Sequence, residues 1–323
     1  MTDSGLNDYI DGVVKGDRRF LSKAITLIES TLPVHREKAA ILLDALVPFS
    51  GKSIRLGVTG VPGVGKSTFI ESLGLELLRQ NHRVAVLAVD PSSKRSGGSI
   101  LGDRTRMIHL SAEPGAFIRP SPSGGTLGGV ASRTRENMIL CEAAGFDVVI
   151  VETVGVGQSE TTVSSMVDFF LVLMLAGAGD ELQGIKKGIM ELADALAINK
   201  ADGDNVNHAE KARKDYETAL HYITPFSALW RPVVHTISSL ENKGIMDVWN
   251  TVLEHHDKLS SHGELESRRK KQAIAWMHDM VEDELKKEFY GRPRVKNLLP
   301  ELTQAIERGL ISPGSAMNKL FDR

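Results

Sequence analysis

The stretch IRLGVTGVPGVGKSTFIESLG, residues 54–74, decides how this chain folds. It starts as a short apolar run, passes through a glycine-rich turn and ends in a helical pattern. Its centre, Gly60 to Ser67, matches G-x-x-x-x-G-K-[ST], a loop whose backbone amides and following helix N-terminus bind phosphate oxygens. Glycine leaves such amides accessible because it has no Cβ. We therefore predict a phosphate-binding loop between a buried strand and a helix.

The predicted phosphate contacts come from one unbroken segment. Its residues are Gly60, Val61, Pro62, Gly63, Val64, Gly65, Lys66, Ser67 and Thr68. Lys66 is expected to reach the β and γ phosphates, which makes it a predicted catalytic residue, and Ser67 is expected to coordinate Mg²⁺. A glycine-rich turn that only caps a helix is the alternative interpretation.

Short apolar runs alternate with helical stretches along the middle of the chain. The strong runs are residues 54–59, 83–90, 146–153, 169–175 and 194–200, and residues 116–120 are a weaker one. Such alternation is typical of βαβ crossovers and of parallel strands buried on both faces of a sheet. The predicted fold class is α/β, a P-loop NTPase with a mostly parallel central sheet flanked by helices.

Helical patterns without strand signals occupy both ends of the chain. We predict an N-terminal helical extension over residues 1–50, a nucleotide-binding domain over 51–258 and a C-terminal helical arm over 259–323. One stripe of the arm is apolar and consists of Ile274, Met277, Val281, Leu285 and Phe289. This stripe is expected to pack on the central domain or on another subunit.

The composition narrows the class of protein. Lys+Arg 39 against Asp+Glu 41 gives a net charge of -2, which disfavours general nucleic-acid binding. No apolar run reaches membrane-spanning length, and the N-terminus is polar, without the apolar core of a secretory signal. The single cysteine, Cys141, excludes an intramolecular disulfide and suits a reducing compartment. We expect a cytoplasmic protein with neither nucleic-acid nor membrane partners.

A base-reading motif ends the apolar run before residue 200. Asn199, Lys200 and Asp202 form N-K-x-D, in which the aspartate accepts hydrogen bonds from the guanine ring N–H and the 2-amino group. Adenine lacks this donor pair, so an adenine nucleotide would leave a carboxylate unpaired. The predicted nucleotides are therefore GTP and GDP. Weaker candidates for base contacts follow a later apolar run, namely Ser238, Ser239 and Leu240.

Acidic residues near the ends of predicted strands are candidates for binding Mg²⁺. Asp90 and Glu152 each lie at the end of an apolar run, and Asp103 lies in a glycine-rich segment. A carboxylate at a strand end beside the phosphate loop can hold magnesium directly or through water. Together with Ser67, these three residues form the predicted magnesium site.

Two glycine-rich segments, residues 91–106 and 154–160, are expected to respond to the γ-phosphate. Loops of this kind become ordered around the triphosphate and its metal and are released after hydrolysis. Gly155 is expected to offer its amide to the γ-phosphate. Gln158 is a candidate for orienting the attacking water, although an ordinary hydrogen-bonded loop glutamine explains it equally well. The predicted catalytic set is Lys66, Glu152, Gly155 and Gln158.

Several long motifs follow one another in a recognisable order: GVTGVPGVGKST, AVDPSSKRSGGSILGDRTRM, VVIVETVGVGQSE and AGAGDELQGIKKGIMELADALAINKADGD. Together they resemble the MeaB/ArgK family of P-loop GTPases. The resemblance implies the phosphate, magnesium and guanine roles given above, and it implies that a loop over residues 177–187 senses a partner protein. Residues 238–240 depart from the family pattern, because they read Ser-Ser-Leu where we expect Ser-Ala-Leu or Ser-Ala-Lys. This departure leaves the role of Ser239 open.

Members of that family are GTPase chaperones of adenosylcobalamin-dependent methylmalonyl-CoA mutase, and the resemblance implies this partner. It further implies GTP hydrolysis that gates loading, protection or reactivation of the mutase, and a homodimer joined through the C-terminal arm. A kinase or ATPase linked to lysine/arginine/ornithine transport, which older family names describe, is one alternative. A nickel metallochaperone GTPase is another, but Cys141 stands alone and His255-His256 is the nearest approach to a histidine tract.

Overall fold

The structure is a computed structural model, and it describes residues 3–30, 32–89, 107–120, 127–153, 159–177, 187–222 and 227–321. The chain divides into two compact units, Met1–Gln272 and Ala273–Arg323. The predicted domain boundaries at 50/51 and 258/259 stay predictions.

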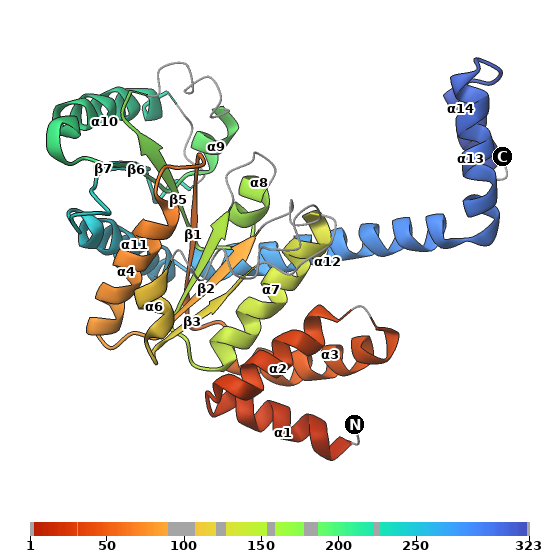
Figure 1. Cartoon of the computed structure of the whole chain (residues 1–323), viewed down its shortest axis with the longest axis horizontal. Coiled ribbons are helices and arrows are strands. Elements are labelled where there is room, and N and C mark those ends of the chain that lie inside the picture. The colour runs from red at the N-terminus through yellow and green to blue at the C-terminus, as the bar shows by residue number, and fades with distance from the viewer. Residues whose placement is uncertain are drawn as a thin grey trace. The chain divides into compact units, whose positions relative to one another are not determined.

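A parallel sheet forms the centre of the first unit (Figure 1). In chain order its strands are β1 (Ile54–Gly60), β2 (Val84–Val89), β3 (Ala116–Arg119), β4 (Val148–Thr153), β5 (Phe169–Leu175), β6 (Ala195–Asn199) and β7 (Val233–Thr236). In space the order is β3-β2-β4-β1-β5-β6-β7, and each of these pairings is parallel. The predicted α/β fold is confirmed, and the weak run at 116–120 forms the edge strand β3.

Helices cover both faces of this sheet, which makes two hydrophobic cores. One core includes residues of α1 (Asp3–Val14), α2 (Arg18–Glu29), α3 (Pro33–Leu46), α7 (Leu127–Ala143), α8 (Ser159–Ser164), α9 (Lys187–Leu192) and α10 (Val206–Leu220). The other includes residues of α4 (Lys66–Arg79), α6 (Ile108–Ala112) and α11 (Ile245–Ser261). Short 3-10 turns follow α3 (η1, Val47–Phe49) and precede α10 (η3, Gly203–Asn205).

The central strands are apolar in nearly every position because both of their faces are covered. All six residues of β4 are buried, and β4 pairs with β1 in the register Val58↔Glu152. Since the strands are parallel, the carboxyl ends of β1, β4 and β6 meet at one edge of the sheet, where open α/β folds bind ligands. The fold therefore brings Gly60, Glu152 and Asn199 to the same edge.

The second unit contains α12 (Glu264–Gly291) from Ala273 onward, followed by α13 (Pro293–Glu307) and α14 (Pro313–Leu320). Within it, Val295, Leu302 and Ala316 are buried between α13 and α14, and the rings of Phe289 and Phe321 stack with centroids 4.4 Å apart. The arm is therefore a long helix that ends in a packed helical hairpin.

Candidate nucleotide-binding site

The loop between β1 and α4 has a backbone that only glycine adopts readily. Gly60 and Gly65 have φ values of 146° and 100°. A Cβ on Gly60 would lie 2.4 Å from the Leu173 carbonyl oxygen, and one on Gly65 would lie 2.6 Å from Asn199 Nδ2. Both positions therefore require glycine, because another residue would be strained at this φ and its Cβ would clash with a neighbouring atom. The loop leads directly into the N-terminus of α4, the helix end that favours anions.

The side chain of Lys66 folds back over this loop. Its Nζ donates to the carbonyl oxygen of Gly60 at 2.7 Å and to that of Val61 at 3.2 Å, and only 8% of the residue is exposed. Burial of the aliphatic stem leaves the ammonium at the loop, where β and γ phosphates are expected. The phosphate role of Lys66 stays a prediction.

Two of the predicted magnesium ligands lie together. Ser67 Oγ, in the first turn of α4, donates to Glu152 Oε1 at 3.0 Å, and Glu152 is 8% exposed at the end of β4. A hydroxyl and a carboxylate are the oxygen ligands that Mg²⁺ prefers, so this pair fits a magnesium ion. The register of β1 and β4 brings these two residues together across 85 residues of sequence.

Four predicted site residues lie outside the described residues: Asp90, Asp103, Gly155 and Gln158. Their roles stay predictions. The same holds for the predicted partner-sensing loop, of which residues 178–186 lie outside the described part of the chain.

Asn199 links the phosphate loop to the segment after β7. Its Nδ2 donates to the Val64 carbonyl oxygen at 2.8 Å, and its Oδ1 accepts from the Ser239 N–H at 3.1 Å and from Ser239 Oγ at 2.9 Å. Asn199 is 1% exposed and Ser239 is 5% exposed. The hydroxyl that departs from the family pattern therefore makes a buried hydrogen bond to the first residue of the N-K-x-D motif.

Asp202 lies beside the other predicted serine. Its Oδ2 accepts from Ser238 Oγ at 2.5 Å, so the carboxylate is hydrogen-bonded to the segment that follows β7. Lys200 adopts φ 60° and is exposed, and Leu240 is 82% exposed. The structure thus gathers Asn199, Asp202, Ser238 and Ser239, whereas the Leu240 side chain points to solvent.

Sequence analysis missed a buried hydroxyl pair next to the loop. Thr59 Oγ1 and Thr153 Oγ1 are 2.6 Å apart, and each residue is 1% exposed. Thr59 precedes Gly60, and Thr153 follows Glu152, so the pair ties the end of β1 to the end of β4. The available signal was a polar residue at the end of each apolar strand run.

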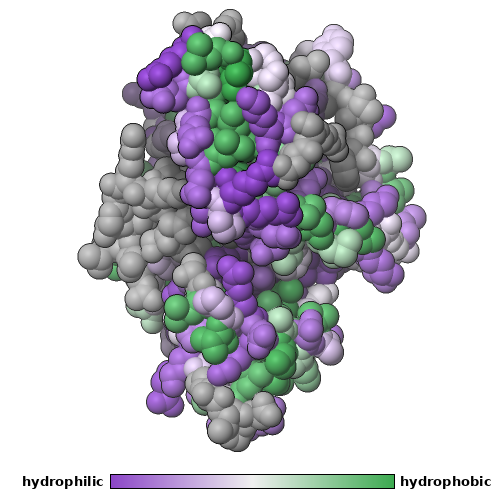
Figure 2. Space-filling view, turned by 90° about the vertical axis from the view of Figure 1, so that its right-hand side faces the viewer, coloured by the Kyte–Doolittle hydropathy of each residue, from purple (hydrophilic) through white to green (hydrophobic). Residues whose placement is uncertain are grey.

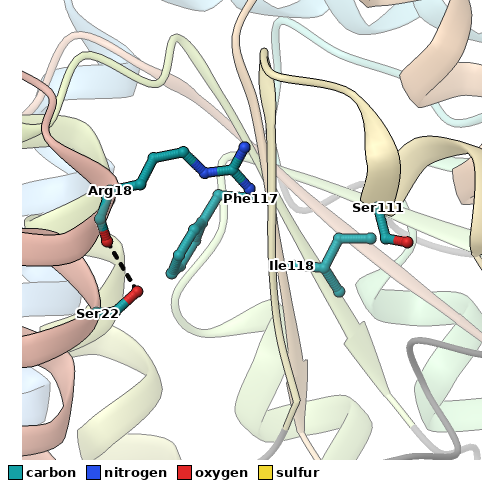
Figure 3. Close-up of a pocket in the computed structure, with 5 residues that line it drawn as sticks. All are labelled: Arg18, Ser22, Ser111, Phe117 and Ile118. Atoms are coloured by element: carbon teal, nitrogen blue, oxygen red, sulfur yellow. Dashed lines mark hydrogen bonds between the residues drawn. The ribbon is translucent and has the colours of Figure 1, made fainter.

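A separate cavity of about 270 Å³ lies at the edge strand β3 (Figure 3). Phe117 and Ile118 of β3 point to opposite faces of the sheet, toward Arg18 and Ser22 on one side and Ser111 on the other (Figure 3). Ser22 Oγ and Ser111 Oγ donate to carbonyl oxygens of their own helices. The cavity contains none of the predicted nucleotide residues, so it is not part of this site.

Among the described residues, no group of three or more His, Cys, Asp or Glu is arranged to hold a metal ion. Burial raises the pKa of the Cys141 thiol, which disfavours the thiolate that binds metals. In the same part of the chain, no helix has the length and apolar character needed to cross a bilayer.

A parallel sheet with a G-x-x-x-x-G-K-[ST] loop after β1 and an N-K-x-D motif after β6 defines a P-loop NTPase. The chain belongs to the family described as methylmalonyl Co-A mutase-associated GTPase MeaB, whose model matches residues 21–294. The resemblance found in the sequence motifs is thereby confirmed.

Relatives are similar to this chain over nearly its whole length. A probable GTPase of Mycobacterium tuberculosis is 50% identical over 320 residues, which cover 98% of this chain and 95% of that protein. The mitochondrial methylmalonic aciduria type A homolog of Mus musculus is 44% identical, over 96% of this chain and 77% of that protein. A crystal structure of a LAO/AO transport system kinase is 40% identical with a TM-score of 0.81, and the match covers 100% of this chain and 98% of that one.

Proposed function

We propose that this chain hydrolyses GTP to GDP and inorganic phosphate. The observation that carries the proposal is the position of Asn199. Its side-chain amide bonds to Val64 in the phosphate loop and to Ser239 beside the predicted guanine reader. The predicted phosphate loop and the predicted base contacts therefore belong to one buried hydrogen-bond network.

In the proposed reaction, a water oxygen attacks the γ-phosphorus while the bond from that phosphorus to the β–γ bridging oxygen breaks. The bridging oxygen keeps the electron pair and leaves as part of GDP, and the proton of the water passes to the released phosphate or to solvent. Lys66 and the loop amides stabilise the negative charge on the phosphate oxygens. Gly155 is proposed to donate its amide to the γ-phosphate, and Gln158 is proposed to orient the water.

Ser67 and Glu152 would hold Mg²⁺, with Asp90 and Asp103 as further proposed ligands. When bound there, the ion supplies positive charge that neutralises the β and γ phosphate oxygens. On the protein side, the bond from Ser67 to Glu152 already places a hydroxyl and a carboxylate together at the start of α4.

Release of phosphate from GTP by the purified chain tests this function. Lys66→Ala should abolish turnover, while circular dichroism and the thermal midpoint stay close to those of the wild type. Lys52→Ala, at an exposed lysine just before β1, is the matched control and should turn over GTP normally. Wild-type turnover by the Lys66 variant would refute the site.

The kinase alternative makes a different prediction for the same phosphate. The LAO/AO transport system kinase has the same fold by its TM-score of 0.81, so the fold does not separate the two activities. GTP labelled on the γ-phosphate should yield free labelled phosphate with the proposed GTPase. Label transferred to lysine, arginine, ornithine or a protein acceptor would favour the kinase.

We further propose that the partner is an adenosylcobalamin-dependent methylmalonyl-CoA mutase, and that GTP hydrolysis gates loading, protection or reactivation of its cofactor. The family description names this mutase, and the mouse relative is named for methylmalonic aciduria. A purified mutase should accelerate GTP turnover and co-elute with the chain on gel filtration. Unchanged turnover together with separate elution would contradict the proposed partner. A cytoplasmic location stays a prediction.

A homodimer through the C-terminal arm is also proposed, and exposed apolar side chains support it. On α12, Ile274, Met277, Val281 and Leu285 are between 50% and 59% exposed. Figure 2 shows further apolar side chains over α13 and α14. In this part of the chain Leu310, between the two helices, is 70% exposed, and Met317 of α14 is 46% exposed.

Gel filtration with light scattering tests the dimer. We expect twice the chain mass for the wild type and a monomer for Leu285→Glu, because a charge on the stripe would be buried in the interface. Lys286→Glu, on the neighbouring polar face of α12, should stay dimeric. A monomeric wild type would refute the dimer.

A further inference from the structure

The segment after β7 is held from two sides, of which one belongs to the predicted nucleotide site. We call residues 238–243 the base loop. Ser238 and Lys243 close it as an antiparallel pair, with N–H to carbonyl distances of 3.0 Å in both directions. On one side of the loop, Ser239 donates to Asn199 and Ser238 donates to Asp202.

The other side of the base loop is fixed to α4. Ser72 Oγ donates to the Ser239 carbonyl oxygen at 2.9 Å, and Asn242 Nδ2 donates to Glu76 Oε1 at 2.6 Å. Ser72 and Glu76 are four residues apart, so they lie on the same face of the helix. Ser239 thus uses its N–H and hydroxyl toward the nucleotide site and its carbonyl oxygen toward α4.

This arrangement closes a circuit around the site. The phosphate loop bonds to Asn199, Asn199 bonds to Ser239, Ser239 bonds to Ser72, and α4 leads back to the phosphate loop at Lys66. One helix therefore carries the phosphate loop at its N-terminus and the base loop on its side. A shift of α4 would move both halves of the site together.

The hydrogen bond from the base loop to Glu76 comes from the residue at the turn of the loop, Asn242. Asn242 has φ 54°, in the left-handed region, which asparagine tolerates better than most residues. Its side-chain amide is then used by Glu76, which lies on the adjoining helix. The carboxylate of Glu76 also pairs with Arg79, one turn further along α4.

We propose that Ser72 and Glu76 are positioning residues for guanine recognition, because they hold the base loop in its binding conformation before the nucleotide arrives. The inference rests on the proposed function, since it requires the base loop to contact guanine. A loop that is already ordered loses less conformational entropy on binding, and the affinity is correspondingly higher. Loss of either contact should therefore weaken binding of the base and leave the chemistry at the γ-phosphate unchanged.

The test compares Ser72→Ala and Glu76→Ala with the conservative variants Ser72→Thr and Glu76→Gln, which keep a donor hydroxyl and an acceptor oxygen. Fluorescent GDP titration should show a Kd about 3–10-fold higher for each alanine variant, the usual effect of losing one hydrogen bond. The KM for GTP should rise by the same factor at unchanged kcat. The Kd for ADP should not change, and the conservative variants should stay within about twofold of the wild type.

Arg79→Ala is the matched control. It removes the other partner of the Glu76 carboxylate and leaves the bond to Asn242 in place, so GDP affinity should equal that of the wild type. Wild-type GDP affinity in both alanine variants would overturn the inference, and so would equal losses of GDP and ADP affinity. A wild-type chain that binds no GDP would instead overturn the proposed function itself.

Discussion

At the scale of single residues, Asp202 carries the predicted choice of base. Its Oδ2 accepts from Ser238 Oγ at 2.5 Å, and Ser238 belongs to the base loop that is proposed to contact guanine. Asp202→Asn replaces an acceptor oxygen with an amide donor, which complements the 2-carbonyl of xanthine instead of the 2-amino group of guanine. We expect affinity for GTP to fall about 10–100-fold, as for a lost charged hydrogen bond, and affinity for XTP to rise.

Competition of GTP and XTP against a fluorescent nucleotide measures this change. Asp204→Asn, at an exposed aspartate two positions further on, should keep the wild-type preference. An unchanged preference for guanine in Asp202→Asn would remove this residue from the base pocket.

Also at this scale, the Thr59–Thr153 hydroxyl pair should contribute to stability. Thr59→Val is nearly isosteric but leaves the buried Thr153 hydroxyl without this partner, which costs about 1–3 kcal/mol. Thr59→Val/Thr153→Val should recover part of that loss, because no buried polar group then loses its partner. Urea unfolding of both variants measures the difference, and equal stability of the single variant and the wild type would contradict the argument.

At the scale of elements, Arg269 fixes the start of α12 to the amino ends of β1 and β5. Its Nε and Nη2 donate to the two oxygens of Asp168 at 2.8 Å and 2.6 Å, and Nη2 also donates to the Ser53 carbonyl oxygen at 2.6 Å. Asp168 accepts from the Arg55 N–H at 2.9 Å as well. The long helix therefore begins on a buried ion pair.

Arg269→Ala should lower the free energy of unfolding by about 3–5 kcal/mol, because it leaves a buried carboxylate without its ion partner. Lys270→Ala, which removes an exposed pair with Glu266, should cost less than about 1 kcal/mol. Chemical denaturation of the two variants decides this. Equal effects would show that the ion pair does not hold the helix.

The same ion pair gives a pH dependence. Burial tends to raise the pKa of Asp168, but hydrogen bonding and charge from Arg269, with charge and a backbone bond from Arg55, outweigh it and hold that pKa below its ordinary value. A depressed folded-state pKa contributes stability above the unfolded value of about 3.9, and that stability is lost as the pH falls further. Below about pH 4, the free energy of unfolding of the wild type should therefore fall more steeply with decreasing pH than that of Arg269→Ala.

Asp194, just before β6, should behave in the opposite way. Burial raises its pKa to about 6 despite the charge of Arg268, so the folded state binds the proton more tightly than the unfolded chain does. Its contribution is present below about pH 4 and is lost as the pH rises through about 6. Asp194→Asn should therefore gain up to about 3 kcal/mol over the wild type at pH 8 and much less at pH 4. An equal difference at both pH values would contradict this assignment.

At the scale of the whole molecule, a nucleotide that joins the phosphate loop to the base loop should stabilise the first unit. GDP at about 100 times its Kd should add about 2.7 kcal/mol to the free energy of unfolding. Differential scanning fluorimetry should show a rise in the thermal midpoint that Lys66→Ala reduces strongly. A shift of the same size with ADP would argue against guanine selectivity.

The sequence by itself determined the parts of this molecule that are contiguous in the chain. The segment from Gly60 to Thr68 and the N-K-x-D motif are local because a turn and a helix start depend on neighbouring residues, and the apolar runs predicted the parallel sheet. Only the tertiary structure decided that Ser239 bonds to Asn199, that Ser72 bonds to the base loop and that Arg269 pairs with Asp168, 101 residues away. Such contacts depend on strand order, register and the placement of helices. The periodicity of a sequence predicts which elements form, but it does not specify which distant residues come within hydrogen-bonding distance.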